Sequence, residues 1–274
     1  MAKARKSGAT KRKSKANSNC GEHVHVCAQP ELPPRPLAPD MHPGRLSLIR
    51  MNEKKWANGT VLKYYFFDRR TDGNRGSWTG TQSQKNAVRA AFQEWKDLGI
   101  GLEFREVSDR EEAEVRIGFE QGAGSWSYLG RDIIDFVTNP NERTMNFGWD
   151  VTTPYGRDTA LHEIGHTLGF PHEHQNPNAG IVWNEQAVID ELSGPPNNWD
   201  EDKIRWNILR KLSQAEVEGS TWDPDSIMHY QFGPGLIDQP EAYRGQFENV
   251  DGFSLHHRDD LDALQRSLRE QTGC

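Results

Sequence analysis

Residues Asp158 to His174 read D-T-A-L-H-E-I-G-H-T-L-G-F-P-H-E-H, and this stretch carries the strongest pattern in the chain. In a helix, His162 and His166 are four residues apart and share one face, so both imidazoles can bind one metal ion. Glu163 directly follows His162 and can face a water molecule beside that ion. The stretch therefore predicts a helix that carries a metal site with a general base next to it.

A catalytic zinc ion usually has three protein ligands and keeps a fourth position for water, so a third ligand is needed. His172 is the candidate, although on a continuous helix it would lie roughly 15 Å along the axis from His162. Gly169 can adopt the left-handed conformation that ends a helix, and Pro171 prevents the helix from resuming. We therefore expect the chain to turn back at Gly169 and to place His172 beside the other two histidines.

A second motif, Ser226-Ile227-Met228-His229-Tyr230, lies downstream. Together with the zinc motif H-E-x-x-H-x-x-G-F-x-H-E, it resembles the astacin family within the metzincin clan of zinc endopeptidases. The resemblance implies a metzincin-type zincin fold of the α+β class. Its upper lobe would hold a mixed, twisted β-sheet and two long helices. Its lower lobe would be smaller and irregular and would contain a C-terminal helix.

The resemblance also assigns roles to individual residues. His162, His166 and His172 would bind one zinc ion per chain. Glu163 would be the catalytic base that acts on a zinc-activated water, and Met228 would lie in a tight turn beneath the metal. These roles describe a zinc-dependent metalloendopeptidase whose partners are protein or peptide substrates.

Further positions match the family pattern or depart from it. Tyr230 matches a tyrosine that can ligate zinc at rest and swing to the reaction intermediate. Glu173 matches a glutamate that can interact with a processed N-terminus, whereas Asn176 stands where animal astacins have an arginine. We expect His174 and His229 to lie at the surface or behind the zinc ligands, because tetrahedral zinc is already satisfied.

Two other classes of function stay open at this point. A non-catalytic binding module could keep zinc for structure, although structural sites usually close all four positions with protein atoms. A nucleic-acid-associated protein could bind through its basic N-terminus, although the acidic remainder offers no folded basic face. The enzyme is favoured because three histidines, a displaceable Tyr230 and Glu163 suit a site that is open to water.

Composition narrows the remaining possibilities. The 274 residues carry a formal net charge of −7, a hydrophobic fraction of 34% and a mean hydropathy of −0.85. No apolar run approaches the roughly 20 residues of a membrane span, so we expect no membrane partner. We also expect a monomer. Residues 1–19 lack the apolar core of a Sec signal peptide. The sequence leaves two compartments open: analogy with the family favours export, whereas the missing signal peptide favours the cell interior.

Residues 1–45 are predicted to be a disordered, basic and proline-rich extension. Its first part could be a targeting or polyanion-binding tail or a solubilising leader, and it carries Lys3, Arg5, Lys6, Lys11, Arg12, Lys13 and Lys15. The cluster from Cys20 to Cys27, which contains two histidines, follows. It could be inert, could form a metal or disulfide clip, or could be a latency device in which a Cys20 or Cys27 thiolate occupies the open position of the zinc. Three cysteines, with Cys274, are too few for a disulfide framework.

The catalytic domain is predicted to span residues 46–274, with an upper lobe over 46–172 and a lower lobe over 173–274. Residues 124–131 resemble the metzincin edge strand, which in relatives binds substrate backbone, and an ordinary loop is the alternative. The residue pattern predicts strands at 60–67, 102–107, 113–119 and 144–149. It predicts helices at 85–98, 185–192, 203–212 and 259–269, in addition to the metal-binding helix. Asp158 or Thr159 is expected to cap that helix.

Overall fold

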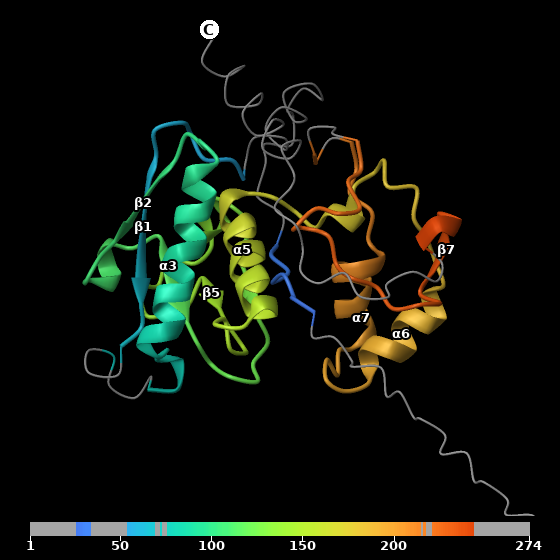
Figure 1. Ribbon diagram of the computed structural model, residues 1–274, viewed down its shortest axis with the longest axis horizontal. Helices are drawn as coiled ribbons and strands as arrows, with labels where there is room; N and C mark the ends of the chain where they lie inside the picture. Colours follow the sequence, from blue (N-terminus) through green and yellow to red (C-terminus); the bar gives the residue numbers. More distant parts are fainter. Residues whose placement is uncertain are drawn as a thin grey trace, which may run out of the picture.

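The computed structural model describes residues 26–33, 54–68, 72, 76–214, 216–217 and 221–243. These residues form two lobes, and helix α5 (Pro154–Leu168) faces the space between them (Figure 1). The helix predicted at 259–269 lies outside the described residues. Within the described ranges, no helix is both long enough and apolar enough to cross a membrane.

A five-stranded mixed sheet forms one layer of the first lobe, with the strand order β2-β1-β3-β5-β4. Three pairs, β1 with β2, β1 with β3 and β3 with β5, are parallel, whereas β4 runs antiparallel to β5 at the edge. This is the mixed sheet that the sequence predicts, although the strands are shorter than expected. Their bounds are β1 (Val61–Phe66), β2 (Glu103–Glu106), β3 (Val115–Gly118), β4 (Trp126–Ser127) and β5 (Met145–Asn146).

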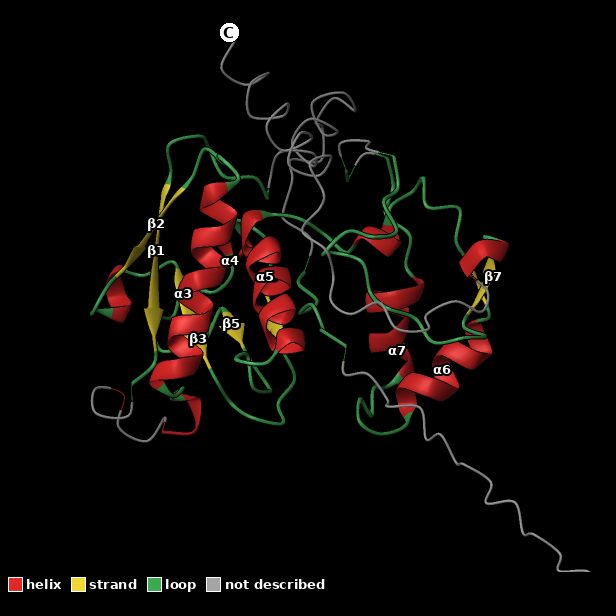
Figure 2. Cartoon of the chain, in the orientation of Figure 1, coloured by secondary structure: helices red, strands yellow, loops and turns green. Residues whose placement is uncertain are grey.

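Two long helices, α3 (Gln82–Asp97) and α5, pack against each other beside this sheet (Figure 2). A capping box between Thr81 and Gln84 satisfies backbone donors at the start of α3. The buried stripe of α3 consists of Val88, Ala91, Phe92 and Trp95, at the helical spacing that predicts a helix at 85–98. The Trp95 indole N–H donates to the Leu161 carbonyl at 3.0 Å, which joins α3 to the middle of α5.

Helix α5 begins five or six residues earlier than the sequence predicts. Its N-cap is Thr153, not Asp158 or Thr159, and the Thr153 hydroxyl accepts the Gly156 N–H at 3.0 Å. Pro154 occupies the first turn, where its missing N–H costs no intrahelical bond. Asp158 and Thr159 are therefore buried inside the helix instead of starting it.

The second lobe consists of short helices and turns. Helices α6 (Glu185–Ser193) and α7 (Glu201–Ile204) lie beside a two-stranded sheet of β6 (Val182–Trp183) and β7 (Ile237–Gln239). α7 runs directly into a π-helical turn, Arg205–Leu209, so the helix predicted at 203–212 begins and ends earlier than expected. The second lobe also contains the 3-10 turns Glu173–Gln175 and Glu241–Tyr243, whereas α4 (Asp132–Asp135) and the 3-10 turns Gly76–Trp78 and Arg110–Glu112 belong to the first lobe.

Residues 26–33 run between the two lobes (Figure 1), although they belong to the extension that is predicted to be disordered. Cys27 is only 6% exposed and packs in the core of the second lobe with Tyr230 and Trp199. On the other side, the Ala28 N–H donates to the Ser125 carbonyl, next to edge strand β4, at 3.3 Å. The segment is ordered because both lobes contribute to its contacts, which local sequence rules do not anticipate.

Candidate active site

The end of α5 turns the chain back toward the helix. Gly169 has a φ of 107°, and its N–H bonds to the carbonyl groups of Gly165 and His166. The Phe170 N–H also bonds to the Gly165 carbonyl, at 3.1 Å. This left-handed C-cap is the turn that the glycine predicts, and it places His172 on the returning strand of chain.

Three imidazole rings meet at this turn, and all three are buried. The ring centroids of His162 and His166 are 4.6 Å apart, and those of His166 and His172 are 4.5 Å apart. The remaining pair, His162 and His172, is separated by 5.3 Å. The structure therefore brings together the three histidines that the sequence predicts as zinc ligands.

Backbone carbonyl groups fix the orientation of two of these rings. The Nδ1 atom of His162 lies 2.7 Å from the Ile227 carbonyl oxygen, and that of His166 lies 2.8 Å from the Phe170 carbonyl oxygen. A carbonyl oxygen can only accept, so each Nδ1 carries the hydrogen and each Nε2 presents a lone pair. This is the arrangement that metal-binding histidines usually have.

The unpartnered lone pairs test whether a metal ion fits. His162 Nε2 is buried and has no hydrogen-bond partner among the described residues. His166 Nε2 lies 3.1 Å from His172 Nε2, and His166 Nε2 has no hydrogen to donate. Two nitrogens on one tetrahedral zinc ion are separated by about 3.4 Å, given Zn–N bonds of about 2.1 Å. The donor set therefore fits a zinc ion.

Cys27 reaches the same centre from the segment between the lobes. One ligand atom from each of Cys27, His162, His166 and His172 lies within 4.8 Å of the others. The Gln29 side-chain amide, two residues further on, lies 2.9 Å from His166 Nδ1. These contacts bring the Cys27 thiol beside the three predicted zinc ligands, and its role as a latency device stays a prediction.

Burial sets the charge states in the absence of a metal. It lowers the pKa of His162 to about 4 and holds the pKa values of His166 and His172 well below their usual range, so the rings are neutral, as ligands must be. Burial raises the pKa of Glu163 to about 8 and that of the Cys27 thiol well above its usual value. A divalent cation would oppose these last two shifts, because it favours a carboxylate and a thiolate.

Met228 and Tyr230 line the centre from the turn at residues 226–230. The Met228 side chain packs on Gly165 of α5 so closely that a Cβ atom there would overlap its sulfur. The Tyr230 ring lies 4.3 Å from the His172 ring and 5.8 Å from the His162 ring, measured between centroids. Its hydroxyl donates to the backbone carbonyl oxygen of Cys27 at 2.6 Å.

Glu173 connects the turn at the third histidine to the methionine turn. Its N–H donates to the Met228 carbonyl at 2.9 Å. Its Oε1 accepts from Asn176 Nδ2 at 2.9 Å and from the Asp223 N–H at 3.1 Å. The carboxylate thus holds two chain segments together, and a contact with a processed N-terminus stays a prediction.

His174 and His229 are buried rather than exposed. The His174 ring stacks on His172 at 5.3 Å and on Tyr230 at 4.7 Å, and its Nε2 donates to the Asn207 carbonyl at 3.0 Å. His229 Nδ1 lies 2.6 Å from the Tyr230 carbonyl oxygen. Of the two expected placements, at the surface or behind the ligands, the structure has the second.

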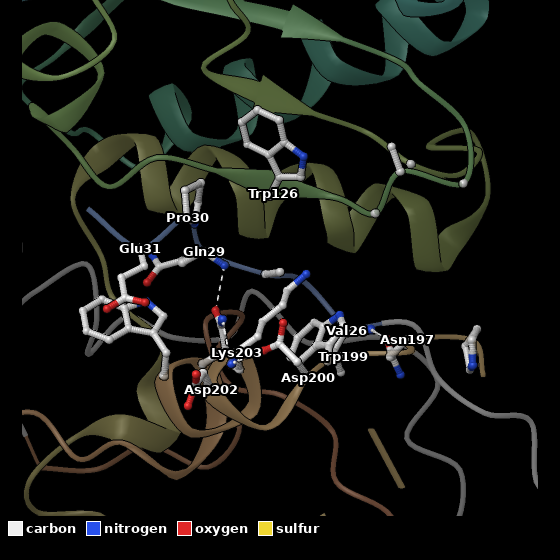
Figure 3. A pocket seen from close by; sticks show the side chains of 18 of the residues that line it. Val26, Gln29, Pro30, Glu31, Trp126, Asn197, Trp199, Asp200, Asp202 and Lys203 are labelled. Atoms are coloured by element: carbon white, nitrogen blue, oxygen red, sulfur yellow. Dashed lines mark hydrogen bonds between the residues drawn. The ribbon is translucent and has the colours of Figure 1, made fainter. Parts of the chain in front are cut away.

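Two asparagines that the sequence did not single out hold the main chain of the segment. The Val26 N–H donates to Asn197 Oδ1 at 3.2 Å, and the Gln29 N–H donates to Asn207 Oδ1 at 2.8 Å. Figure 3 shows the segment crossing a pocket of about 630 Å³, with Trp126 on one side and Asn197 on the other. No local pattern marks these asparagines, because their partners lie more than one hundred residues away in the sequence.

Comparison with known proteins places this geometry in a family. Residues 49–234 match the family model of astacin, which describes a family of peptidases. The solved structure of myroilysin superposes with a TM-score of 0.66 and 30% identity, and the match covers 80% of this chain and 97% of myroilysin.

Two curated relatives match over shorter stretches. Karilysin from Tannerella forsythia is 26% identical over 211 residues, which cover 62% of this chain and 41% of karilysin. Serralysin from Photorhabdus laumondii is 34% identical over 125 residues, which cover 40% of this chain and 25% of serralysin. The chain therefore spans less than half the length of either curated relative. The match of the astacin model over most of the chain, together with the histidine centre, shows that the chain belongs to the astacin family of zinc metallopeptidases.

Proposed function

We propose that this chain is a zinc-dependent endopeptidase that hydrolyses peptide bonds of proteins, and that the segment bearing Cys27 keeps it latent. The observation that carries the proposal is the convergence of Cys27, His162, His166 and His172 on one buried centre next to Glu163. Membership of a peptidase family supports the same reaction. The curated relatives are much longer than the stretches that match this chain, so the activity of a whole relative does not transfer to it. Protein substrates are therefore proposed for this chain.

Three histidines would hold the metal through Nε2, with Nδ1 hydrogen bonds to Ile227 and Phe170 keeping two rings in position. When bound, zinc supplies a Lewis acid that lowers the pKa of a water molecule and polarises a peptide carbonyl. Burial keeps the rings neutral, so they are ready to act as ligands without losing a proton.

Glu163 would be the general base. Its carboxylate would take a proton from the attacking water and deliver it to the leaving nitrogen. Both carboxylate oxygens are buried, and among the described residues no nitrogen or oxygen binds them, so their contact is a hydrogen bond with the Cys27 thiol. Burying a carboxylate in this way is costly, and a zinc site that serves only structure has no need of it. This favours the enzyme over a non-catalytic zinc module.

Tyr230 would stabilise the oxyanion. Its hydroxyl donates to a peptide carbonyl oxygen, that of Cys27, within the candidate site. A substrate carbonyl at the same place would receive the same hydrogen bond, which becomes stronger as negative charge develops on the oxygen. One such donor is worth about 3 kcal/mol in the transition state.

Cys27 would account for latency in two ways. A Cys27 thiolate would fill the fourth position, which a catalytic zinc site keeps for water. The main chain of residues 26–33 would also occupy the edge next to β4, where an extended substrate would add as a further strand. Release or cleavage of this segment would open both positions.

The test compares variants of the zinc-loaded full chain on quenched fluorescent casein. Cys27→Ala should hydrolyse casein without an activating treatment, whereas the matched control Cys20→Ala should stay as slow as the wild type. Adding Glu163→Gln to Cys27→Ala should lower the rate about 1,000-fold with the zinc content unchanged, because only the base is lost.

Each part of the proposal can fail separately in this assay. A Cys20→Ala chain that is as active as Cys27→Ala would assign latency to the wrong thiol. Retained turnover after Glu163→Gln would reject the base. No hydrolysis by any zinc-containing form would reject the peptidase.

A further inference from the structure

Asn207 is a preoriented hydrogen-bond acceptor that lines the pocket crossed by residues 26–33. Its side chain is 2% exposed and belongs to the π-helical turn Arg205–Leu209, a type of turn that is frequent at functional sites. Its Nδ2 donates to the Lys203 carbonyl at 3.1 Å, while its Oδ1 accepts the Gln29 N–H at 2.8 Å. Because one partner can only accept and the other can only donate, the amide has one orientation, with Oδ1 toward the segment.

We propose that Asn207 Oδ1 binds a main-chain N–H of the substrate once residues 26–33 have left the cleft, so that the peptidase discriminates against proline at that substrate position. This inference rests on the proposed function. A buried acceptor that loses its donor is costly, so the incoming peptide must replace the N–H of Gln29. Every residue type except proline can supply it.

The surroundings of residues 26–33 indicate that this pocket binds substrates and does not serve latency alone. The pocket of about 630 Å³ next to the segment leaves room for side chains larger than those of Ala28 and Gln29. Figure 3 shows Trp126 on one wall and Trp199 with Lys203 on the other. The backbone is therefore held at fixed points beside open space. A site of this kind accepts many sequences but requires an N–H at a defined place.

The test is a double-mutant cycle between Asn207 and single backbone nitrogens of a peptide substrate. Full-length zinc-loaded Cys27→Ala protein is given a peptide that it cleaves, and then a series in which one backbone nitrogen at a time is methylated. We expect methylation at one position, within a few residues of the scissile bond, to lower kcat/KM about 10-fold, mainly through KM. After Asn207→Ala, the same methylation should change kcat/KM less than about 2-fold.

Asn86→Ala is the matched control, because Asn86 is an exposed asparagine on α3, and it should keep the full methylation effect. If Asn207→Ala does not fold, Asn207→Leu replaces it. Leucine has nearly the same shape and no hydrogen-bonding atom, so the methylation effect should again fall below about 2-fold, and a full effect would overturn the inference.

The outcomes separate this inference from the peptidase proposal. No hydrolysis of any peptide by the Cys27→Ala protein would reject the peptidase itself. Hydrolysis with equal methylation effects before and after Asn207→Ala would overturn the inference alone. A second measurement uses the chain that retains Cys27 and follows the reaction of its thiol with a disulfide reagent. If Asn207→Ala speeds that reaction but leaves the methylation effect unchanged, Asn207 acts only in the latent state, and the inference is overturned.

Discussion

Helix α5 and residues 26–33 meet at the same centre but are held in place very differently. The helix is buried within the core of the first lobe, where Gly165 packs on Met228 without room for a Cβ atom. Hydrogen bonds from three backbone N–H groups, those of Val26, Ala28 and Gln29, hold the segment to the two lobes. Three such bonds contribute about 3 kcal/mol together. The Tyr230 hydroxyl adds a fourth bond, to the Cys27 carbonyl. The helix is thus part of the core, whereas a few hydrogen bonds and the buried Cys27 hold the segment, which the proposed latency requires to be released.

This contrast teaches how one centre can have both a stable and a releasable ligand. The three histidines cannot leave without unfolding α5 or the turn after it. Under the proposed latency, Cys27 would leave with its segment while the sheet, α3 and α5 keep their contacts. A metal ion would join the two regions, so its removal should distinguish them most clearly.

Chelation should have the largest effect. It should abolish hydrolysis by the Cys27→Ala protein, and added zinc should restore it, because the metal supplies the electrophile. The wild type should also lose more thermal stability than Cys27→Ala, because its metal binds one more ligand in the folded state. Activity assays and differential scanning calorimetry, each with and without chelator, measure the two losses. Equal losses of stability would show that Cys27 contributes no bond to the metal.

Tyr230→Phe should have the next largest effect. In the Cys27→Ala background we expect a decrease in kcat of about 100-fold, since one oxyanion donor is lost. Phenylalanine keeps the ring packing against His162 and His172, so zinc content and melting temperature should stay the same. Steady-state kinetics with metal analysis tests this. A parallel loss of zinc would mean that the tyrosine acts by supporting the ligands.

Gly169→Ala should have the smallest effect of the three. An alanine at φ 107° is strained by about 1–2 kcal/mol, and it would shift the turn that leads to His172. The full chain should melt several degrees lower and bind zinc less tightly. Gly233→Ala is the matched control, because no atom lies within 4 Å of its added Cβ and its φ is ordinary. Equal melting temperatures for the two variants would show that the turn tolerates a side chain.

The same contrast explains what could be predicted from the sequence. The turn after α5 was predictable because His162, Gly169 and His172 are close in the chain and obey local rules of helix geometry. The strands and α3 followed from apolar periodicity. The start of α5 was misplaced because Thr153, Asp158 and Thr159 can all cap a helix, and only the position of Pro154 favours the first.

The role of the segment could not be decided in the same way. The sequence left several roles open for Cys27, because the residues that contact it lie far along the chain, on α5 and after it. Asn197 and Asn207 gave no signal at all, since an asparagine that binds a backbone N–H resembles any polar surface residue until the fold is known. Contacts between distant parts of the chain account for most of what the sequence left open.

The hydrogen bond from Tyr230 to the Cys27 carbonyl has a practical consequence for ligand design. Residues 26–33 offer a thiol, a carbonyl for the phenol, and N–H groups for two asparagines within one short extended peptide. A synthetic peptide that keeps these groups and varies the other side chains is a natural starting scaffold for inhibitors of this protein.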